Sequence, residues 1–351
     1  MRRVLPRAEW NFDTARFELP FWRAVEARVA ALGALGVVAD IILFHPYDNG
    51  HWGLDCNPEA VDHAYVRYAA ARLSALSNVW WSMANEWSQL KCKCAGQDKL
   101  HCPQDYFDRL FATLVASDPH GRMRSIHNGP IYYNHSQPWI THISMQCHVS
   151  ECVDNATAAW LPKPIVMDEV RYEGNLSASW AQLSGVDMAQ RFWMFLSKGA
   201  YTGHSVCLQP AAVTDACAPD PNACSCSTVM WWNHGGALDG AAPPLLAFFR
   251  SYAAALPVPF GELRSTALAP GVFWLRSADA GAAFSLMLWD AAALNVTVPV
   301  TLPGLPAGAA YAAREVDIAR GALVPLGTLA APVVFEPPTP GYVLELRAIA
   351  S

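Results

Sequence analysis

Apolar and polar positions follow two different rhythms along the chain. Between residues 20 and 256, segments with apolar residues every three to four positions alternate with short, continuous apolar runs. This alternation is typical of repeated strand–helix units on a parallel sheet. The predicted helices are 21–35, 62–76, 104–117, 188–197 and 244–256, and the predicted strands are 38–44, 78–86, 124–128, 140–147, 165–169 and 200–206.

The pattern changes after Leu256. Helical periodicity disappears, and short β-type runs are separated by Gly, Pro and Ala turns. The clearest runs are 271–276, 283–289, 296–302 and 342–346. We therefore predict an α/β domain over residues 1–256 and a small antiparallel β-sandwich over residues 257–351.

Two of the predicted strands end in acidic residues. The run 78–86 ends in Asn85-Glu86, and the run 165–169 ends in Asp168-Glu169. A parallel barrel presents its active-site residues at these carboxyl ends. Cleavage of a glycosidic bond needs one protonated and one ionised carboxyl group, about 5 to 5.5 Å apart in enzymes that retain configuration. The alternative is that either glutamate pairs with an arginine or caps a helix.

Other predicted strands are also followed by polar or aromatic residues. Such side chains can bond sugar hydroxyls or pack on the C–H faces of a sugar ring. The alternative is a histidine satisfied within its own loop, or an aromatic ring in the core. The candidate ligand residues are His45, Asp48, Trp87, His127, Asn128, His148, Tyr172, His204 and Trp232. No His-x-Glu-x-x-His pattern occurs, so we expect neither a metal nor another cofactor.

The composition of the chain argues against nucleic acid and membranes as partners. The 351 residues are 53% hydrophobic and only 15% charged, with a net charge of −6. No basic block is present to match a phosphate backbone, which argues against nucleic acid. The longest apolar run, 29–39, is too short to span a bilayer. Oligomeric state cannot be read from these features.

Cysteines and glycosylation sequons indicate a secretory protein. Ten cysteines cluster in predicted loops, which favours disulfides over a zinc site, with free thiols as a further alternative. Four Asn-x-Ser/Thr sequons start at Asn134, Asn155, Asn175 and Asn295. The beginning of the chain, Met1-Arg-Arg-Val-Leu-Pro-Arg, has no apolar signal-peptide region. We therefore expect one of two explanations. Either the chain is a fragment that lacks its natural N-terminus, or the four sequons occur by chance.

The segments HPYD, NVWWSMANEW, SIHN, KPIVMDEVRYEGN and WWNHGG resemble a known enzyme group. They are similar to clan A glycoside hydrolases, and more narrowly to the apiosidase-like and cellulase-like bacterial glycosidases that end in a small β-sandwich. The resemblance implies a (β/α)8 barrel with Glu86 as acid/base after strand 4 and Glu169 as nucleophile after strand 7. It also implies that Asn85 bonds the sugar hydroxyl next to the anomeric carbon.

The resemblance makes the predicted strand 38–44 the third strand of the barrel. Six of eight strands are then found, and we expect a truncated barrel without strands 1 and 2. The expected function is retaining hydrolysis of O-glycosidic bonds in plant, algal or microbial poly- or oligosaccharides. The alternative is a secreted carbohydrate-binding protein without catalysis. An esterase would need a Gly-x-Ser-x-Gly motif, which is absent.

Overall fold

The computed structural model describes residues 2–3, 12–46, 57–92, 99–100, 104–160, 162–176, 178–208, 240–277, 284–289, 299–339 and 341–349. These fall into two compact units. The first comprises residues 1–146 and 156–166, and the second comprises residues 147–155 and 167–351. Each unit is described by itself.

The first unit is built on parallel strands. β3 (Ala39–Phe44) pairs with β4 (Val79–Ala84), and β4 pairs with β7 (Arg124–Ser125). A parallel bridge between His127 and Ser144 then joins the segment after β7 to β8 (Ile143–Gln146). The strands therefore lie side by side in chain order, as successive βα units do.

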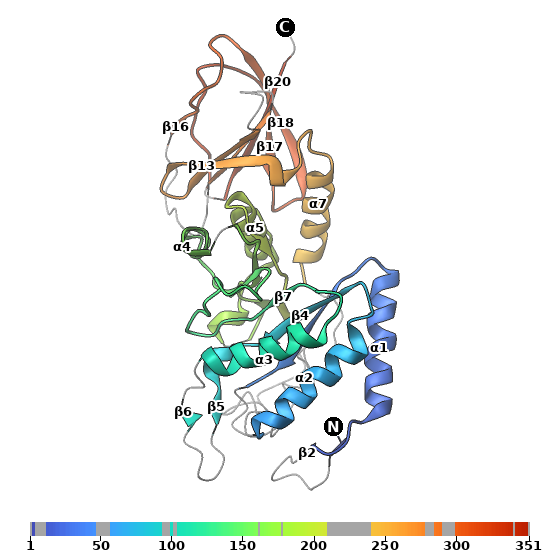
Figure 1. The fold of residues 1–351 in the computed structure, drawn as a ribbon. Coiled ribbons are helices and arrows are strands. Elements are labelled where there is room, and N and C mark those ends of the chain that lie inside the picture. The colour runs from blue at the N-terminus through green and yellow to red at the C-terminus, as the bar shows by residue number, and fades with distance from the viewer. Residues whose placement is uncertain are drawn as a thin grey trace. The chain divides into compact units, whose positions relative to one another are not determined.

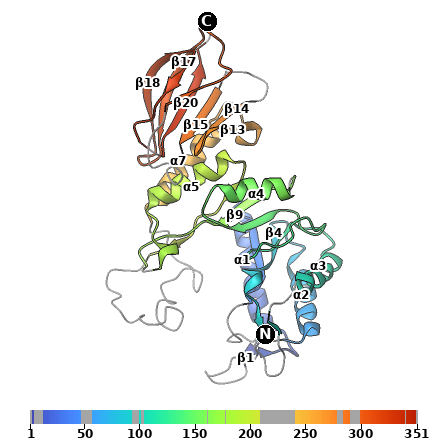
Figure 2. The ribbon, with the colours of Figure 1, turned by 90° about the vertical axis from the view of Figure 1, so that its left-hand side faces the viewer.

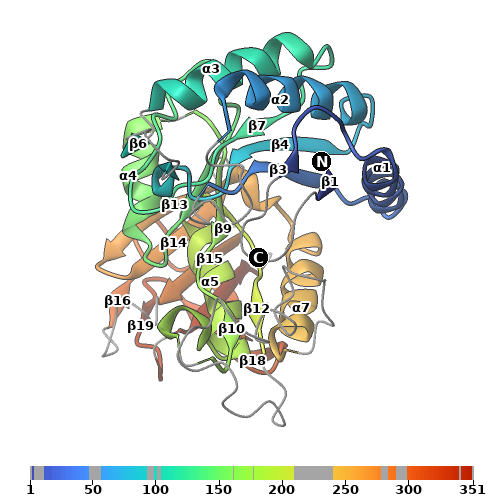
Figure 3. The ribbon, with the colours of Figure 1, turned by 90° about the horizontal axis from the view of Figure 1, so that it is seen from below.

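Three helices accompany these strands, namely α1 (Leu19–Ala34), α2 (Glu59–Leu73) and α3 (Gln104–Ser117). Pro20 stands in the first turn of α1, where its missing N–H costs no hydrogen bond. Gly36 follows α1 at a φ of 73°, a left-handed conformation suited to glycine. α2 and α3 lie next to each other along the sheet (Figure 3). Arg109 of α3 binds Glu59 of α2 through two nitrogen atoms.

Five of the six residues of β4 are buried and Trp80 is half-buried, as expected for a strand covered on both faces. Val79, Trp81 and Met83 are inaccessible to solvent. The indole N–H of Trp81 donates to Oδ2 of Asp118 at 3.0 Å, so its one polar atom is satisfied. β4 therefore fixes the direction in which the chain enters Asn85 and Glu86.

β9 (Ile165–Glu169) begins in the first unit and ends in the second. It lies in a three-stranded sheet with the order β11-β9-β8, where β11 is Tyr201–Thr202. β10 (Glu173–Gly174) pairs in parallel with β12 (Val206–Cys207). This region also contains α4 (Glu151–Trp160), α5 (Gly185–Ser197) and α7 (Ala242–Ala254), of which α5 packs against β10, β11 and α7.

α5 begins with a capping box. The Ser184 hydroxyl accepts from the backbone of Asp187, and the Asp187 carboxylate accepts from the backbone of Ser184. These two bonds satisfy donors that the first turn of a helix leaves open. Trp193 of α5 packs against Phe249 and Tyr252 of α7. The two helices thus share an aromatic contact in the second unit.

The C-terminal part is an antiparallel sheet of six strands, drawn in orange to red in Figures 1 and 2. A core of large side chains, including Trp274, Trp289 and Tyr311, packs on it. In sheet order the strands are β13 (Leu263–Ala269), β14 (Val272–Ser277), β15 (Phe284–Trp289), β20 (Val343–Ala348), β17 (Ala310–Asp317) and β18 (Ala322–Ala330). β16 (Val300–Thr301) pairs separately with β19 (Val334–Phe335).

The remaining elements are short. They are β1 (Arg2–Arg3), β2 (Phe12–Asp13), β5 (Lys91–Cys92), β6 (Lys99–Leu100) and the 3-10 helices Trp87–Gln89, Ser179–Ala181 and Phe260–Glu262. In the described part of the chain, no helix has the length and apolar character that crossing a bilayer would require.

The prediction of an α/β region followed by an antiparallel sheet is confirmed. Some elements were not anticipated from sequence, namely α4, β13, β17 and β18. The predicted strand 200–206 is divided into β11 and β12. The missing barrel strands, the domain boundary at residue 256 and the β-sandwich stay predictions.

Candidate active site

Polar residues gather at the carboxyl edge of the first unit's parallel sheet. The backbone N–H of Asn85 donates to the carbonyl of Phe44 at 2.9 Å, and that of His127 donates to Ala84 at 3.0 Å. These bonds bring His45, Glu86 and His127 to one edge of the sheet. Within the first unit, the residues that follow β3, β4 and β7 thus lie at neighbouring strand ends.

Glu86 has an unusual backbone. Its φ and ψ are 45° and 50°, in the left-handed region that residues other than glycine rarely adopt. The next residue, Trp87, donates its N–H to the carbonyl of His127 at 3.1 Å, and Gln89 donates to the carbonyl of Glu86 at 2.9 Å. The surrounding hydrogen bonds thus hold the strained residue in place.

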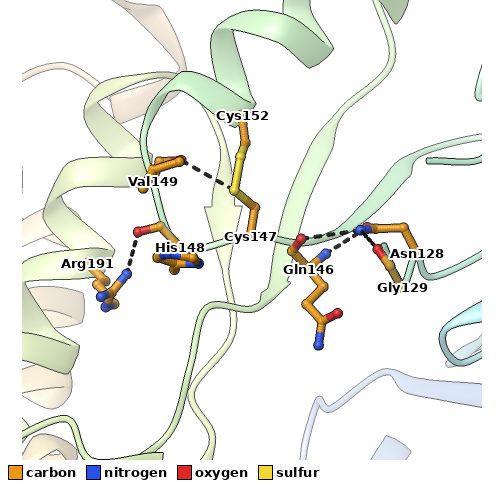
Figure 4. Close-up of a disulfide and its surroundings, with 8 residues drawn as sticks. All are labelled: Asn128, Gly129, Gln146, Cys147, His148, Val149, Cys152 and Arg191. Carbon is orange, nitrogen blue, oxygen red and sulfur yellow. Dashed lines mark hydrogen bonds between the residues drawn. A yellow bond between two sulfur atoms is a disulfide. The ribbon is translucent and has the colours of Figure 1, made fainter. Parts of the chain in front are cut away.

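Asn128 and His127 are buried in the first unit. Asn128 donates to the carbonyls of Gly129 and Gln146, and its Oδ1 accepts from the N–H of Gln146 at 2.8 Å (Figure 4). Nδ1 of His127 lies 3.3 Å from the hydroxyl of Ser144. The Asn128 amide therefore joins the segment after β7 to the end of β8, and its expected contact with sugar stays a prediction.

Trp87 lies in the core, where it was not expected. Its side chain is only 6% exposed. The ring meets Phe107 of α3 at 6.0 Å and Tyr133 at 5.6 Å, both edge to face. Trp87 is therefore part of the hydrophobic core of this unit, where the sequence had suggested a position in the cleft.

Glu169 ends β9 in the second unit. Its Oε1 accepts a hydrogen bond from the hydroxyl of Tyr172 at 3.0 Å. The ring of Tyr172 in turn packs edge to face on Trp180 at 5.1 Å. Two predicted site residues, Glu169 and Tyr172, are thus in direct contact.

Cys207 lies close enough to Glu169 for the carboxylate to affect the pKa of the thiol. Burial, with a further contribution from the Glu169 carboxylate, raises the pKa of the Cys207 thiol to about 12. The thiol is free and buried in β12, not in a loop disulfide. The Cys207 thiol is therefore neutral near pH 7 and adds no negative charge beside Glu169.

His148 lies in the second unit, in a loop closed by the Cys147–Cys152 disulfide (Figure 4). The N–H of Cys147 donates to the carbonyl of Glu169 at 3.2 Å, so this loop starts beside the end of β9. Arg191 of α5 donates to the carbonyl of His148 at 2.7 Å. Burial, together with the charges of Arg171 and Arg191, lowers the pKa of His148. Its imidazole is therefore neutral near pH 7.

His204 follows β11, and its Nε2 lies 3.1 Å from Oε2 of Glu173. Sequence reasoning did not single out Glu173. The signal was present, because a glutamate four residues after Glu169 is followed by Gly174 in the segment RYEGN. Position alone gave no reason to separate it from a surface glutamate.

Two predicted site residues, Asp48 and Trp232, lie outside the described residues. Within the part of the chain that the structure describes, no group of three His, Cys, Asp or Glu side chains is arranged to hold a metal ion.

Solved structures with a similar fold are glycoside hydrolases. A Bacteroides vulgatus protein described as a candidate glycoside hydrolase is 26% identical, with a TM-score of 0.70, over 97% of this chain and 66% of that chain. A family 5 glycoside hydrolase from the same organism is 13% identical, with a TM-score of 0.67, over 93% and 74%. A third glycoside hydrolase is 13% identical, with a TM-score of 0.68, over 97% and 81%. The chain thus spans just under two thirds of the first protein.

A search of curated proteins found no match. The sequence profile of apiosidase-like catalytic domains, in contrast, matches residues 5–209. That span is more than half of the 351 residues and contains both strand-end glutamates. The chain therefore belongs to the family of apiosidase-like catalytic domains.

Proposed function

We propose that the protein is a retaining glycoside hydrolase, with Glu86 as acid/base and Glu169 as nucleophile. Its substrates would be plant, algal or microbial poly- or oligosaccharides, in which it would cleave O-glycosidic bonds. The observation that carries the proposal is the position of the two glutamates, one two residues after the end of β4 and one at the end of β9. In enzymes built on parallel barrels, such strand ends supply the reacting groups.

The backbone of Glu86 supports a functional role. A left-handed conformation costs a residue with a Cβ about 1 to 2 kcal/mol. Such strain persists where the surroundings over-determine it, and it clusters at active sites. A residue placed there only to end a strand would be replaced by glycine or asparagine at lower cost.

The surroundings of Glu169 suit a nucleophile. The hydroxyl of Tyr172 donates to Oε1, which holds the carboxylate in one orientation. The thiol of Cys207, which lies near Glu169, is neutral because its pKa is raised to about 12. No charge repulsion from that thiol opposes the ionised form that a nucleophile requires.

In the first step, an oxygen of Glu169 would attack the anomeric carbon as the bond to the leaving oxygen breaks. Glu86 would give its proton to that oxygen. In the second step, Glu86 would take a proton from water as the water oxygen displaces Glu169. Two inversions at one carbon retain its configuration. The proposal requires both carboxyl groups to act on the same sugar ring.

The test is release of aryl alcohol from a panel of aryl glycosides. We expect Glu169→Ala and Glu86→Ala to lose at least about a thousandfold in kcat. Azide should restore turnover of Glu169→Ala and give a glycosyl azide of inverted configuration. Glu262→Ala, at an exposed glutamate, is the matched control and should keep full activity. Wild-type binding of sugars without any turnover would instead support a carbohydrate-binding protein.

We also propose that the protein acts outside the cell. The Cys147–Cys152 disulfide supports this, because such bonds persist in oxidising compartments. Expression with a secretion signal should give this bond in full, as measured by thiol labelling and mass spectrometry. A reduced pair in the secreted protein would contradict the proposal.

A further inference from the structure

Glu173 is a buried carboxylate to which the proposed reaction assigns no role. Only 3% of the residue is exposed. Its Oε1 accepts from the backbone N–H groups of Ala241 at 2.5 Å and Ala242 at 3.1 Å, and its Oε2 faces Nε2 of His204 at 3.1 Å. Within the described residues, these three are its hydrogen-bond partners. No lysine or arginine is among them.

The backbone builds this arrangement from three distant segments. β10 pairs with β12, so that Glu173 lies beside Val206, and its N–H donates to the carbonyl of Ser205 at 2.9 Å. Gly240 makes room for the carboxylate, because a Cβ atom there would overlap Oε2 of Glu173. α7 has no capping side chain of its own, since Ala241 precedes it. Glu173 supplies the anion that a helix N-terminus favours.

His204 lies close to the end of β9. The N–H of Gly203 donates to the carbonyl of Met167 at 2.9 Å, two residues before Glu169. A Cβ atom at Gly203 would come within 2.8 Å of the carbonyl oxygen of Asp168. The chain therefore reaches His204 directly beside the strand that ends in Glu169. The His204 side chain is 14% exposed, so solvent or a ligand can reach it.

The contact with Glu173 decides which nitrogen of His204 carries the proton. An ionised carboxylate only accepts hydrogen bonds, so Nε2 must be the donor. In the neutral imidazole, Nδ1 then has no hydrogen and is an acceptor. A ring held in this way can accept a hydrogen bond from a hydroxyl group, and a sugar offers many hydroxyl groups.

We propose that Glu173 is a positioning residue that holds His204 as the Nε2–H tautomer, so that Nδ1 accepts a hydrogen bond from a hydroxyl of the sugar bound at Glu169. This deepens the proposed function and rests on it for the identity of the ligand. The tautomer itself is a property of the free protein.

The first test is a long-range proton–nitrogen NMR spectrum of protein labelled with 15N-histidine. We expect His204 to be the Nε2–H tautomer in the wild type. In Glu173→Gln the amide oxygen can still accept from Ala241 and Ala242, while its NH2 group faces His204. Nε2 then becomes the acceptor, and we expect the Nδ1–H tautomer. Asp187→Asn, which alters the exposed cap of α5, is the control and should leave His204 unchanged.

The second test separates the two nitrogens of His204. Asparagine places a polar atom near the position of Nδ1, and glutamine places one near Nε2. If Nδ1 binds substrate, His204→Asn keeps more kcat/KM on the aryl glycoside than His204→Gln. A purely structural role in holding Glu173 predicts the opposite order. Glu173→Gln should lower kcat/KM about tenfold to a hundredfold.

The proposal is overturned if wild-type His204 is the Nδ1–H tautomer, if Glu173→Gln leaves the tautomer unchanged, or if His204→Gln is the more active variant. Absence of glycosidase activity in the wild type is a separate result. It overturns the proposed function and the sugar contact with it, and the spectrum alone then decides whether Glu173 sets the tautomer.

Discussion

Two buried carboxylates of the second unit are held in different ways. Glu345 of β20, in the C-terminal sheet, is inaccessible to solvent and binds Arg314, Arg347 and the hydroxyl of Tyr252. Glu173, near the end of β9, has two backbone amides and His204. One carboxylate is matched by opposite charges. The other is matched by donors that carry no full charge when the histidine is neutral.

The difference shows in what each carboxylate can do. Burial by itself would raise the pKa of Glu345, but hydrogen bonds from Arg347, Tyr252 and Arg314 bring it below its ordinary value. That carboxylate is ionised and is held by two guanidinium groups and a hydroxyl group, so we expect it to contribute to stability. Glu173 instead faces a histidine with an exposed edge. Changes there should affect function more than stability.

The largest effect is expected at Glu345. Glu345→Ala leaves the Tyr252 hydroxyl and two guanidinium groups without their shared partner, and we expect a loss of about 3 kcal/mol in the free energy of unfolding. The value lies at the lower end for buried pairs because Arg314 and Arg347 are 29% and 39% exposed. Urea unfolding at pH 7 measures it. A loss below about 1 kcal/mol would mean that Glu345 does not have the stabilising role that distinguishes it from Glu173.

Glu86 extends the comparison to the first unit, where the strained backbone should cost stability. We expect Glu86→Gly to raise the free energy of unfolding by about 1 kcal/mol while it abolishes activity. Gly36→Ala is the matched reverse change, at a φ of 73° with open space around it. It should lose about 1 kcal/mol and keep activity. Destabilisation by Glu86→Gly would refute the strain argument.

A smaller loss of stability is expected at Glu173. Glu173→Gln keeps an oxygen for the two amides of α7 and removes only the charge beside the helix N-terminus. We expect a loss of about 0.5 to 1 kcal/mol. The same urea measurement as for Glu345 applies. Equal losses at Glu173 and Glu345 would mean that the two carboxylates do not differ in role.

The smallest effect concerns a partly exposed ion pair. The hydrogen bond from Arg109 is the main reason that the pKa of Glu59 falls to about 2, against an ordinary value of 4.5. A lowered folded-state pKa gives stability that is complete above pH 4.5 and is lost as the pH falls towards 2. At pH 7 the free energy of unfolding of the wild type should therefore exceed that of Glu59→Gln, by less than about 1 kcal/mol. The difference should vanish below pH 2, and a constant difference would contradict the assignment.

The sequence determined the features that depend on neighbours along the chain. The apolar run ending in Glu169 predicted β9, and helical periodicity predicted α3 (Gln104–Ser117), both with the observed bounds. The strand ends that carry Glu86 and Glu169 were visible for the same reason. Periodicity and apolar runs are local signals, and secondary structure follows them where no distant contact overrides them.

Only the tertiary structure decided how individual side chains are used. The sequence predicted Trp87 in a sugar-binding cleft, and its contacts with Phe107 and Tyr133 placed it in the core. The role proposed for Glu173 depends on a hydrogen bond from Ala241, which lies 68 residues further along the chain. The left-handed backbone of Glu86 depends on a hydrogen bond from Trp87 to His127, which lies on another strand end. These roles are set by atoms brought together across long loops, and no local pattern encodes such distances.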